Sequence, residues 1–236
     1  MTWVQPLSLI VAVQILILAA GATLTGKISA NVARRLSDYY SPILRHIALG
    51  ISVGLIFDIF AGSMLGIFTY PSAERPHSPL EIDLTFLIFN VLFSYSIFSL
   101  TIAQFTSALK HAGAVRPILV LPLLVAAVIV VLVSGNGLLF VFACGVIFLS
   151  AVELMAFYSG RPTPLGALPK TRKWFATLAL SSAVVGFFYE VANLTFNLWD
   201  WTFLSASHDL SEVALVVLFG YFVLAYPFAV FHRKDV

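Results

Sequence analysis

Long apolar stretches alternate with short polar segments along almost the whole chain. Seven apolar stretches of about 20 residues or more are recognised by their lack of charge and by the turn residues between them. They lie near residues 7–26, 43–68, 81–108, 116–134, 137–158, 174–201 and 211–231. Because each is long enough to cross about 30 Å of hydrocarbon as a helix, the pattern predicts an all-α protein with seven transmembrane helices.

The composition leaves no room for a soluble catalytic domain. Of the 236 residues, 60% are hydrophobic and only 10% are charged, and the mean hydropathy is +0.99. These values exclude nucleotide-dependent pumps and enzymes with large ectodomains, so any chemistry lies among the helices or in short loops. The single cysteine, Cys144, excludes an internal disulfide framework and a cysteine-built metal site.

The distribution of positive charge predicts the orientation of the chain. With seven helices, twelve of the 13 Lys and Arg residues fall on one side, and only Arg75 falls on the other. Since Lys and Arg accumulate on the cytoplasmic side, we expect the N-terminus outside and the C-terminus inside, in the cytoplasmic membrane. The cations are spread over four segments, so we expect a lipid bilayer and no nucleic acid as partner.

An internal repeat relates the two halves of the sequence. A shift of 132 residues places Asp58 on Glu190 and Gly54 on Gly186, and a shift of 131 places Glu81 on Glu212 and Tyr95 on Tyr226. The repeat predicts a 3+1+3 arrangement of helices in which both three-helix units run in the same direction. Its parts are a first unit over 1–110, a linker helix within 111–136 and a second unit over 137–236.

Carboxylates are the chemistry-bearing residues of this chain. An ionisable side chain inside a membrane span costs at least about 2.5–3.5 kcal/mol and points to function. Seven acids lie within or at the ends of the predicted spans: Asp58, Glu81, Asp83, Glu153, Glu190, Asp200 and Glu212. All except Glu153 fall in the outer half of the membrane. We therefore expect an outer carboxylate cluster.

The spacing around two of these acids predicts how they are presented. Gly50, Gly54 and Asp58 recur every four residues, a stripe that lets a neighbouring helix approach closely. On the sixth helix, Asn193 and Asn197 lie one and two turns from Glu190 on the same face. Asn90, on the third helix, is expected to join these amides.

No Lys or Arg lies near these acids within a span, so burial should favour the neutral acid. A neutral carboxylic acid can donate a proton, which suits a general acid and a proton-coupled transporter equally. The five histidines are scattered, and the chain has no aspartate-rich diphosphate motif and no phosphate-binding glycine loop. We therefore expect neither a metal nor a cofactor.

Taken together, the repeat and its acids resemble the membrane-integral lycopene cyclases, which occur as bacterial heterodimers, archaeal fusions and one half of fungal bifunctional enzymes. In that family each unit carries an acid, a small residue three positions later, two aromatics further on, and a Pro-x-Glu-Glu motif. The matching residues of the second unit are Glu190, Asn193, Trp199 and Trp201. Those of the first unit are Asp58, Ala61, Ile67, Tyr70, Pro79 and Glu81. Two departures stand out, since Ile82 replaces the second glutamate and no proline precedes Ser211-Glu212.

The resemblance implies a redox-neutral cyclisation of an isoprenoid or carotenoid by proton transfer. Asp58 and Glu190 would form the acid–base pair, with Glu81, Asp83 and Glu212 as assisting acids. Substrate-binding candidates are the amides and aromatics around them: Asn90, Asn193, Asn197, Phe57, Phe188, Tyr189 and Trp199. Aromatic faces would stabilise a carbocation.

Two other functions fit the same sequence. Parallel three-helix repeats are also found in small sugar transporters of the SWEET type, and a carboxylate-lined cavity suits a proton- or cation-coupled carrier. A small apolar chain can also serve as a non-catalytic subunit of a membrane complex. The sequence leaves the substrate and the oligomeric state open.

Overall fold

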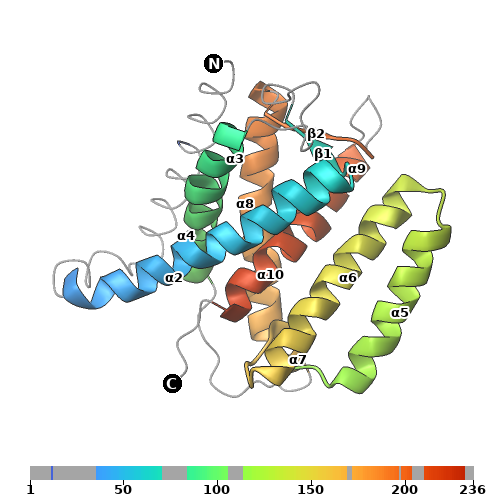
Figure 1. The fold of residues 1–236 in the computed structure, drawn as a ribbon, viewed down its shortest axis with the longest axis horizontal. Helices are drawn as coiled ribbons and strands as arrows, with labels where there is room; N and C mark the ends of the chain where they lie inside the picture. The colour runs from blue at the N-terminus through green and yellow to red at the C-terminus, as the bar shows by residue number, and fades with distance from the viewer. Residues whose placement is uncertain are drawn as a thin grey trace. The chain divides into compact units, whose positions relative to one another are not determined.

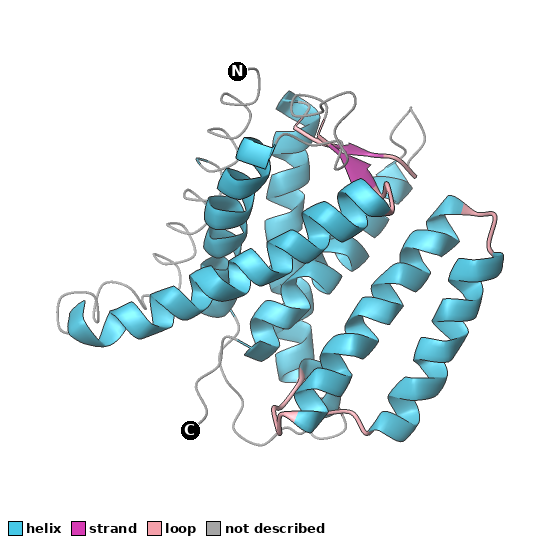
Figure 2. Cartoon of the chain, in the orientation of Figure 1, coloured by secondary structure: helices cyan, strands magenta, loops and turns pink. Residues whose placement is uncertain are grey.

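The computed structural model confirms a mostly helical chain (Figures 1 and 2). It describes residue 12 and residues 36–70, 84–105, 114–168, 172–196, 198–203 and 210–231. These residues fall into two compact units, one formed by Met1–Phe105 with Val184–Thr202, the other by Thr106–Ala183 with Phe203–Val236. Among the described residues, strands occur only as one short antiparallel pair.

The described part of the first unit holds two long helical segments and the strand pair. Its first segment is α2 (Leu36–Leu55), which passes without a break into a π-helix, η1 (Ile56–Met64). The second consists of α3 (Leu84–Phe89), the π-helix η2 (Asn90–Tyr95) and α4 (Ser96–Phe105). The end of α8 (Lys173–Phe196) completes the unit. Strands β1 (Phe68–Thr69) and β2 (Asp200–Trp201) pair so that Phe68 lies opposite Trp201.

The predicted close approach of a helix to the glycine stripe is confirmed at two positions. A β-carbon on Gly50 would lie 2.6 Å from the backbone nitrogen of Ser96, and one on Gly54 would lie 2.7 Å from Cδ2 of Tyr95. Contacts shorter than 3.0 Å leave no space for a side chain. The two helical segments therefore approach to backbone contact at Gly50, and the Tyr95 ring packs directly on the helix at Gly54.

The helix predicted over 43–68 ends earlier than expected. Gly66 has a φ of +61°, which L-residues with side chains rarely adopt. The amide of Ile67 donates to the carbonyl of Ala61 across 2.9 Å, and that of Gly66 to the carbonyl of Gly62 across 2.8 Å. A glycine in this conformation ends a helix. The chain therefore leaves η1 before Phe68, where β1 begins.

The helix predicted over 174–201 also ends early, at Phe196. Oδ1 of Asn193 accepts hydrogen bonds from the amides of Leu198 and Trp199, at 3.0 and 2.8 Å. The side chain of Asn193 thus takes the place of the backbone carbonyls of the last helical turn as the acceptor of these amides. The residues that follow form β2 instead of another turn.

The second unit is built from helices. α5 (Pro117–Val133) and α6 (Gly137–Tyr158) lie side by side as a hairpin (Figure 1), and α6 covers the range predicted from the sequence. The short helix α7 (Pro164–Ala167) follows. α9 (Leu210–Leu215), the π-helix η3 (Val216–Gly220) and α10 (Tyr221–Phe231) form the last segment, and α10 packs on α6.

Three helices of the described chain are long and apolar enough to cross a membrane. They are His46–Met64, Gly137–Tyr158 and Lys173–Thr195. Shorter apolar helices span Phe86–Ile102, Pro117–Val133 and Leu218–Phe231. The first predicted helix, 7–26, lies outside the described residues except for residue 12.

Candidate functional site

Asp58 is buried within the first unit and accepts hydrogen bonds from three neutral side chains. The residue is 1% exposed. Oδ1 accepts from the phenols of Tyr95 and Tyr70, at 2.7 and 3.0 Å, and Oδ2 accepts from the amide nitrogen of Asn90 at 2.8 Å. The same amide donates to the Tyr70 oxygen across 3.1 Å. A buried carboxylate with a donor on each oxygen is held in one orientation.

The two π-helices bring these groups together. Asp58 lies in η1, whereas Asn90 and Tyr95 are the first and last residues of η2. A π-helix is rare, and inside an α-helix it is frequently found at a functional site. Tyr70 follows β1 directly and approaches Asp58 from the end of the helices.

Tyr70 stays a neutral donor to the carboxylate. Burial raises the pKa of the Tyr70 phenol well above its ordinary value of 10.0, and the neighbouring Asp58 charge raises it further. Ionisation of Tyr70 beside Asp58 would place two negative charges within hydrogen-bond distance. The phenol therefore remains protonated at neutral pH.

Glu190, the second predicted acid, is also buried in the first unit at 4% exposure. The indole N–H of Trp201 lies 3.2 Å from Oε1 and 3.3 Å from Oε2, and the amide nitrogen of Asn193 lies 3.4 Å from Oε2. Glu190 and Asn193 are on α8, while Trp201 is on β2. The turn fixed by Asn193 thus returns Trp201 to the helix that carries Glu190.

Three aromatic rings connect the two carboxylates. The rings of Tyr70 and Phe68 form a T-shaped contact with 5.5 Å between their centroids. The rings of Phe68 and Trp201 form a second T-shaped contact, also with 5.5 Å between centroids. Tyr70 donates to Asp58 at one end and Trp201 donates to Glu190 at the other. We call Asp58, Glu190, Tyr70, Phe68 and Trp201 the paired-carboxylate site.

Four predicted aromatics differ in their surroundings. Tyr189 is buried and stacks on Phe98 with 5.7 Å between ring centroids, and Phe57 is half-buried. Phe188 is 51% exposed, and its ring forms a T-shaped contact with the ring of Phe187. Trp199 is half-buried, and its buried indole N–H has no acceptor within the described part of the chain.

Four other predicted residues lie beyond the described atoms. Glu81, Asp83 and Asn197 fall in ranges that the structure does not describe. Glu212 lies in α9, but its side chain is outside the described set. Asn90, by contrast, is described, and it contacts Asp58.

The second unit holds a separate buried carboxylate, Glu153, on α6. Oε2 accepts from the hydroxyl of Thr163 at 2.9 Å and from the amide of Val115 at 3.0 Å, and Oε1 accepts from the phenol of Tyr226. The Tyr226 oxygen in turn accepts from the amide of Leu165. This network ties the segments before α5 and around α7 to α6 and α10, which is a structural role.

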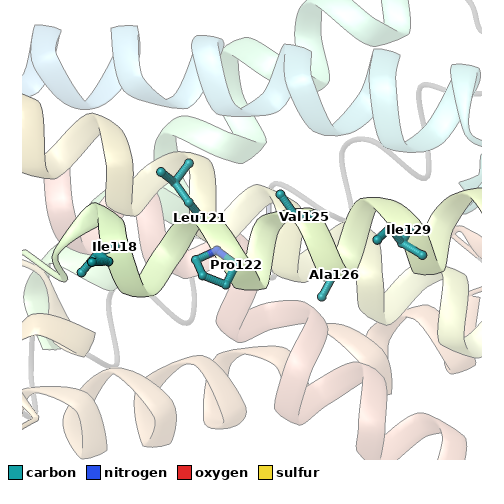
Figure 3. A pocket seen from close by; sticks show the side chains of 6 residues that line it. All are labelled: Ile118, Leu121, Pro122, Val125, Ala126 and Ile129. Atoms are coloured by element: carbon teal, nitrogen blue, oxygen red, sulfur yellow. The ribbon is translucent and has the colours of Figure 1, made fainter.

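A shallow pocket of about 560 Å³ lies along α5 (Figure 3). Its lining is entirely apolar: Ile118, Leu121, Pro122, Val125, Ala126 and Ile129. Such a surface offers no group that can donate or accept a proton. The buried carboxylates Asp58, Glu153 and Glu190 do not line this pocket.

No metal site is evident in the part of the chain that the structure describes. Groups of three or more His, Cys, Asp or Glu side chains suited to a metal ion do not occur there. The donors around Asp58 are phenols and an amide, which hold a carboxylate through hydrogen bonds.

Tyr95, Tyr70, Phe68 and Trp201 were not among the predicted site residues. Signals for three of them existed, because Tyr95 recurs in the repeat as Tyr226, while Tyr70 and Trp201 occupy the aromatic positions of the family motif. Phe68 had no signal, since an aromatic in an apolar run is typical of packing.

No family model, curated protein or solved structure matches this chain.

Proposed function

We propose that this protein is a multi-pass membrane protein that cyclises an isoprenoid or carotenoid through proton transfer by Asp58 and Glu190. The observation that carries the proposal is the paired-carboxylate site, in which two buried acids are joined by three aromatic rings within one compact unit. Each acid also has donors that orient it, Tyr70 for Asp58 and Trp201 for Glu190.

The chemistry is an isomerisation without an external oxidant or reductant. One carboxylic acid donates its proton to a carbon of an alkene, forming a C–H bond and a carbocation. A second alkene attacks the cation and closes the ring, and the other carboxylate removes a proton to restore a double bond. The substrate gains one proton from the acid and loses one to the base, so the product has the formula of the substrate, and return of a proton from the base to the acid restores both groups.

The surroundings of the two acids suit this reaction. An acid that protonates an alkene must be held in its neutral form, and removal from water favours that form. The faces of aromatic rings stabilise a cation that forms nearby. Phe68, Tyr70 and Trp201 are placed beside the two acids by β1 and β2.

The proposal includes a location in the cytoplasmic membrane and the 3+1+3 topology. The three long apolar helices and the three shorter ones support a polytopic chain. A hydrocarbon substrate dissolves in the bilayer, so a site among apolar helices gives it direct access.

Expression in a lycopene-accumulating bacterial host tests the reaction. We expect a cyclised pigment from the wild-type chain, detected by chromatography, and its loss in Asp58→Asn and Glu190→Gln. Asp200→Asn is the matched control, because Asp200 is a half-buried acid that joins β2 through its backbone. All variants are quantified as folded protein in the membrane fraction.

The outcome separates the candidate functions. Unchanged lycopene with folded protein in the membrane would overturn the carotenoid reaction and leave cyclisation of other isoprenoids. Proton-coupled uptake of a solute by the wild-type chain, lost in Asp58→Asn, would establish a transporter instead. If substitution of either acid changes neither product formation nor uptake, the protein is a structural subunit.

A further inference from the structure

The strand pair between the two carboxylates is unusually small for the groups that it holds. β1 and β2 contain two residues each, and a two-stranded pair of this size is marginally stable by itself. Yet Phe68 and Trp201, the central pair, and Tyr70, which follows β1, all belong to the paired-carboxylate site. Contacts outside the pair therefore help to hold the two strands in register.

Thr202 supplies this contact immediately after β2. Its amide donates to the carbonyl of Ile67 across 3.1 Å. Its hydroxyl donates to the carbonyl of Gly66 and, at 3.1 Å, to the carbonyl of Ile67. The hydroxyl thus bonds the backbone at the point where Gly66 turns the chain from η1 into β1.

The register decides which way the aromatic side chains point. Phe68 and Tyr70 are two residues apart and share one face, and Trp201 is opposite Phe68 on that face. A slip of one residue would turn Trp201 to the other face and remove its N–H from Glu190. The same slip would separate the Phe68 ring, which packs against Tyr70, from Trp201.

We propose that Thr202 is a positioning residue that holds one hydrogen-bond donor of each carboxylate in place, Tyr70 for Asp58 and Trp201 for Glu190. Thr202 itself is exposed and contacts neither acid. Its effect on Asp58 passes through β1 to Tyr70, and its effect on Glu190 passes through β2 to Trp201. A role for Thr202 in catalysis rests on the proposed function. Its effect on the donors of the two acids depends only on the contacts described above.

Labelling with a lipid-soluble carbodiimide tests the coupling without any substrate. The reagent adds to carboxyl oxygens, so donors that occupy those oxygens slow the reaction. The labelling rates of Asp58, Glu190 and Glu153 are followed separately by mass spectrometry on the full chain in membranes. Glu153 serves as internal reference, because its own donors belong to the second unit.

Thr202→Val removes the hydroxyl at constant volume. We expect labelling of Asp58 and Glu190 to rise together by about fivefold or more, the scale of one lost hydrogen bond, with Glu153 unchanged. Thr202→Ser keeps the hydroxyl and should restore the wild-type rates. Thr195→Val is the matched control, since the exposed Thr195 hydroxyl donates only within its own helix, to Val191 at 2.7 Å.

Three results would overturn the proposal: unchanged rates, a change at only one of the two acids, or an equal rise at Glu153 that marks general loosening. If Thr202→Val does not accumulate, Thr202→Cys is judged by the same criteria. The labelling experiment uses no substrate, so its result does not depend on the outcome of the cyclisation assay. The two proposals are therefore tested independently.

Discussion

The phenol of Tyr95 donates to Oδ1 of Asp58 across 2.7 Å and joins the two π-helices of the first unit. Both residues are buried, and they are separated by 37 positions in the sequence. The bond is therefore a long-range contact that fixes η1 against η2 as well as orienting a carboxylate.

Tyr95→Phe removes this donor and keeps the ring. Loss of one hydrogen bond to a buried carboxylate should lower the free energy of unfolding by about 1–3 kcal/mol. We expect chemical denaturation in detergent to show this decrease. Tyr158→Phe is the control, because Tyr158 is 78% exposed; an equal loss in both variants would contradict the role of the Tyr95 phenol.

Gly54→Ala tests the space that the Tyr95 ring needs. The new β-carbon would lie 2.7 Å from Cδ2 and 2.9 Å from Cγ of that ring. Overpacking of this kind costs about 1–3 kcal/mol, which exceeds the gain of up to about 1 kcal/mol from replacing a helical glycine. We expect a lower unfolding temperature, whereas Gly135→Ala, with nothing within 4 Å, should not lower it. A stabilised Gly54→Ala variant would show that the ring moves aside freely.

Asn193 combines two tasks that two substitutions can separate. Asn193→Ala removes the acceptor of the Leu198 and Trp199 amides together with the donor to Glu190. Asn193→Asp keeps the acceptor but places a second carboxyl beside Glu190. We expect Asn193→Ala to lose about 1–3 kcal/mol in denaturation experiments, and Asn193→Asp to lose less but to form no cyclised product. Equal destabilisation by both would show that the turn does not depend on this oxygen.

Tyr70→Phe gives a pH-dependent difference in stability. The folded-state pKa of Tyr70 is raised well above 10.0, so the phenol ionises first in the unfolded chain. The stability that Tyr70 contributes is thus complete below pH about 10 and decreases above it. We expect the difference in unfolding temperature between wild type and Tyr70→Phe to be constant from neutral pH to about 10 and to shrink at higher pH. A difference that grows with pH would contradict the assignment.

The helices of the described chain were largely predictable because apolar runs and turn residues determine them. The run from Gly137 to Tyr158 is bounded by Ser134-Gly135-Asn136 and by Ser159-Gly160, and α6 has the predicted limits. The helix predicted to begin at 43 begins at Leu36, and the predicted ends at 68 and 201 were several residues too late, since the helices end at Met64 and Phe196. Hydropathy does not register a left-handed glycine such as Gly66 or a side-chain acceptor such as Asn193.

The candidate site was predictable in its acids and only partly in their partners. Asp58 and Glu190 stand out because a carboxylate in an apolar run is rare. Asn90 was expected near Glu190, yet the structure places it on Asp58. Tyrosines in apolar runs are typical of packing, so only the fold reveals that the hydroxyls of Tyr70 and Tyr95 meet a carboxylate. The seven-helix topology and the duplicated unit stay predictions.

The order of the chain has a consequence for biosynthesis. The first unit is closed by Val184–Thr202, which emerge from the ribosome long after Phe105. At about 5–20 residues per second, this delay lasts about 5–20 s. The hydrogen-bond partners of Asp58, which are Tyr70, Asn90 and Tyr95, are all synthesised before the delay, and Glu190 is synthesised together with Asn193 and Trp201. Each acid is thus made in one stretch of synthesis with its own hydrogen-bond donors, and the pairing of Phe68 with Trp201 can form only after the delay.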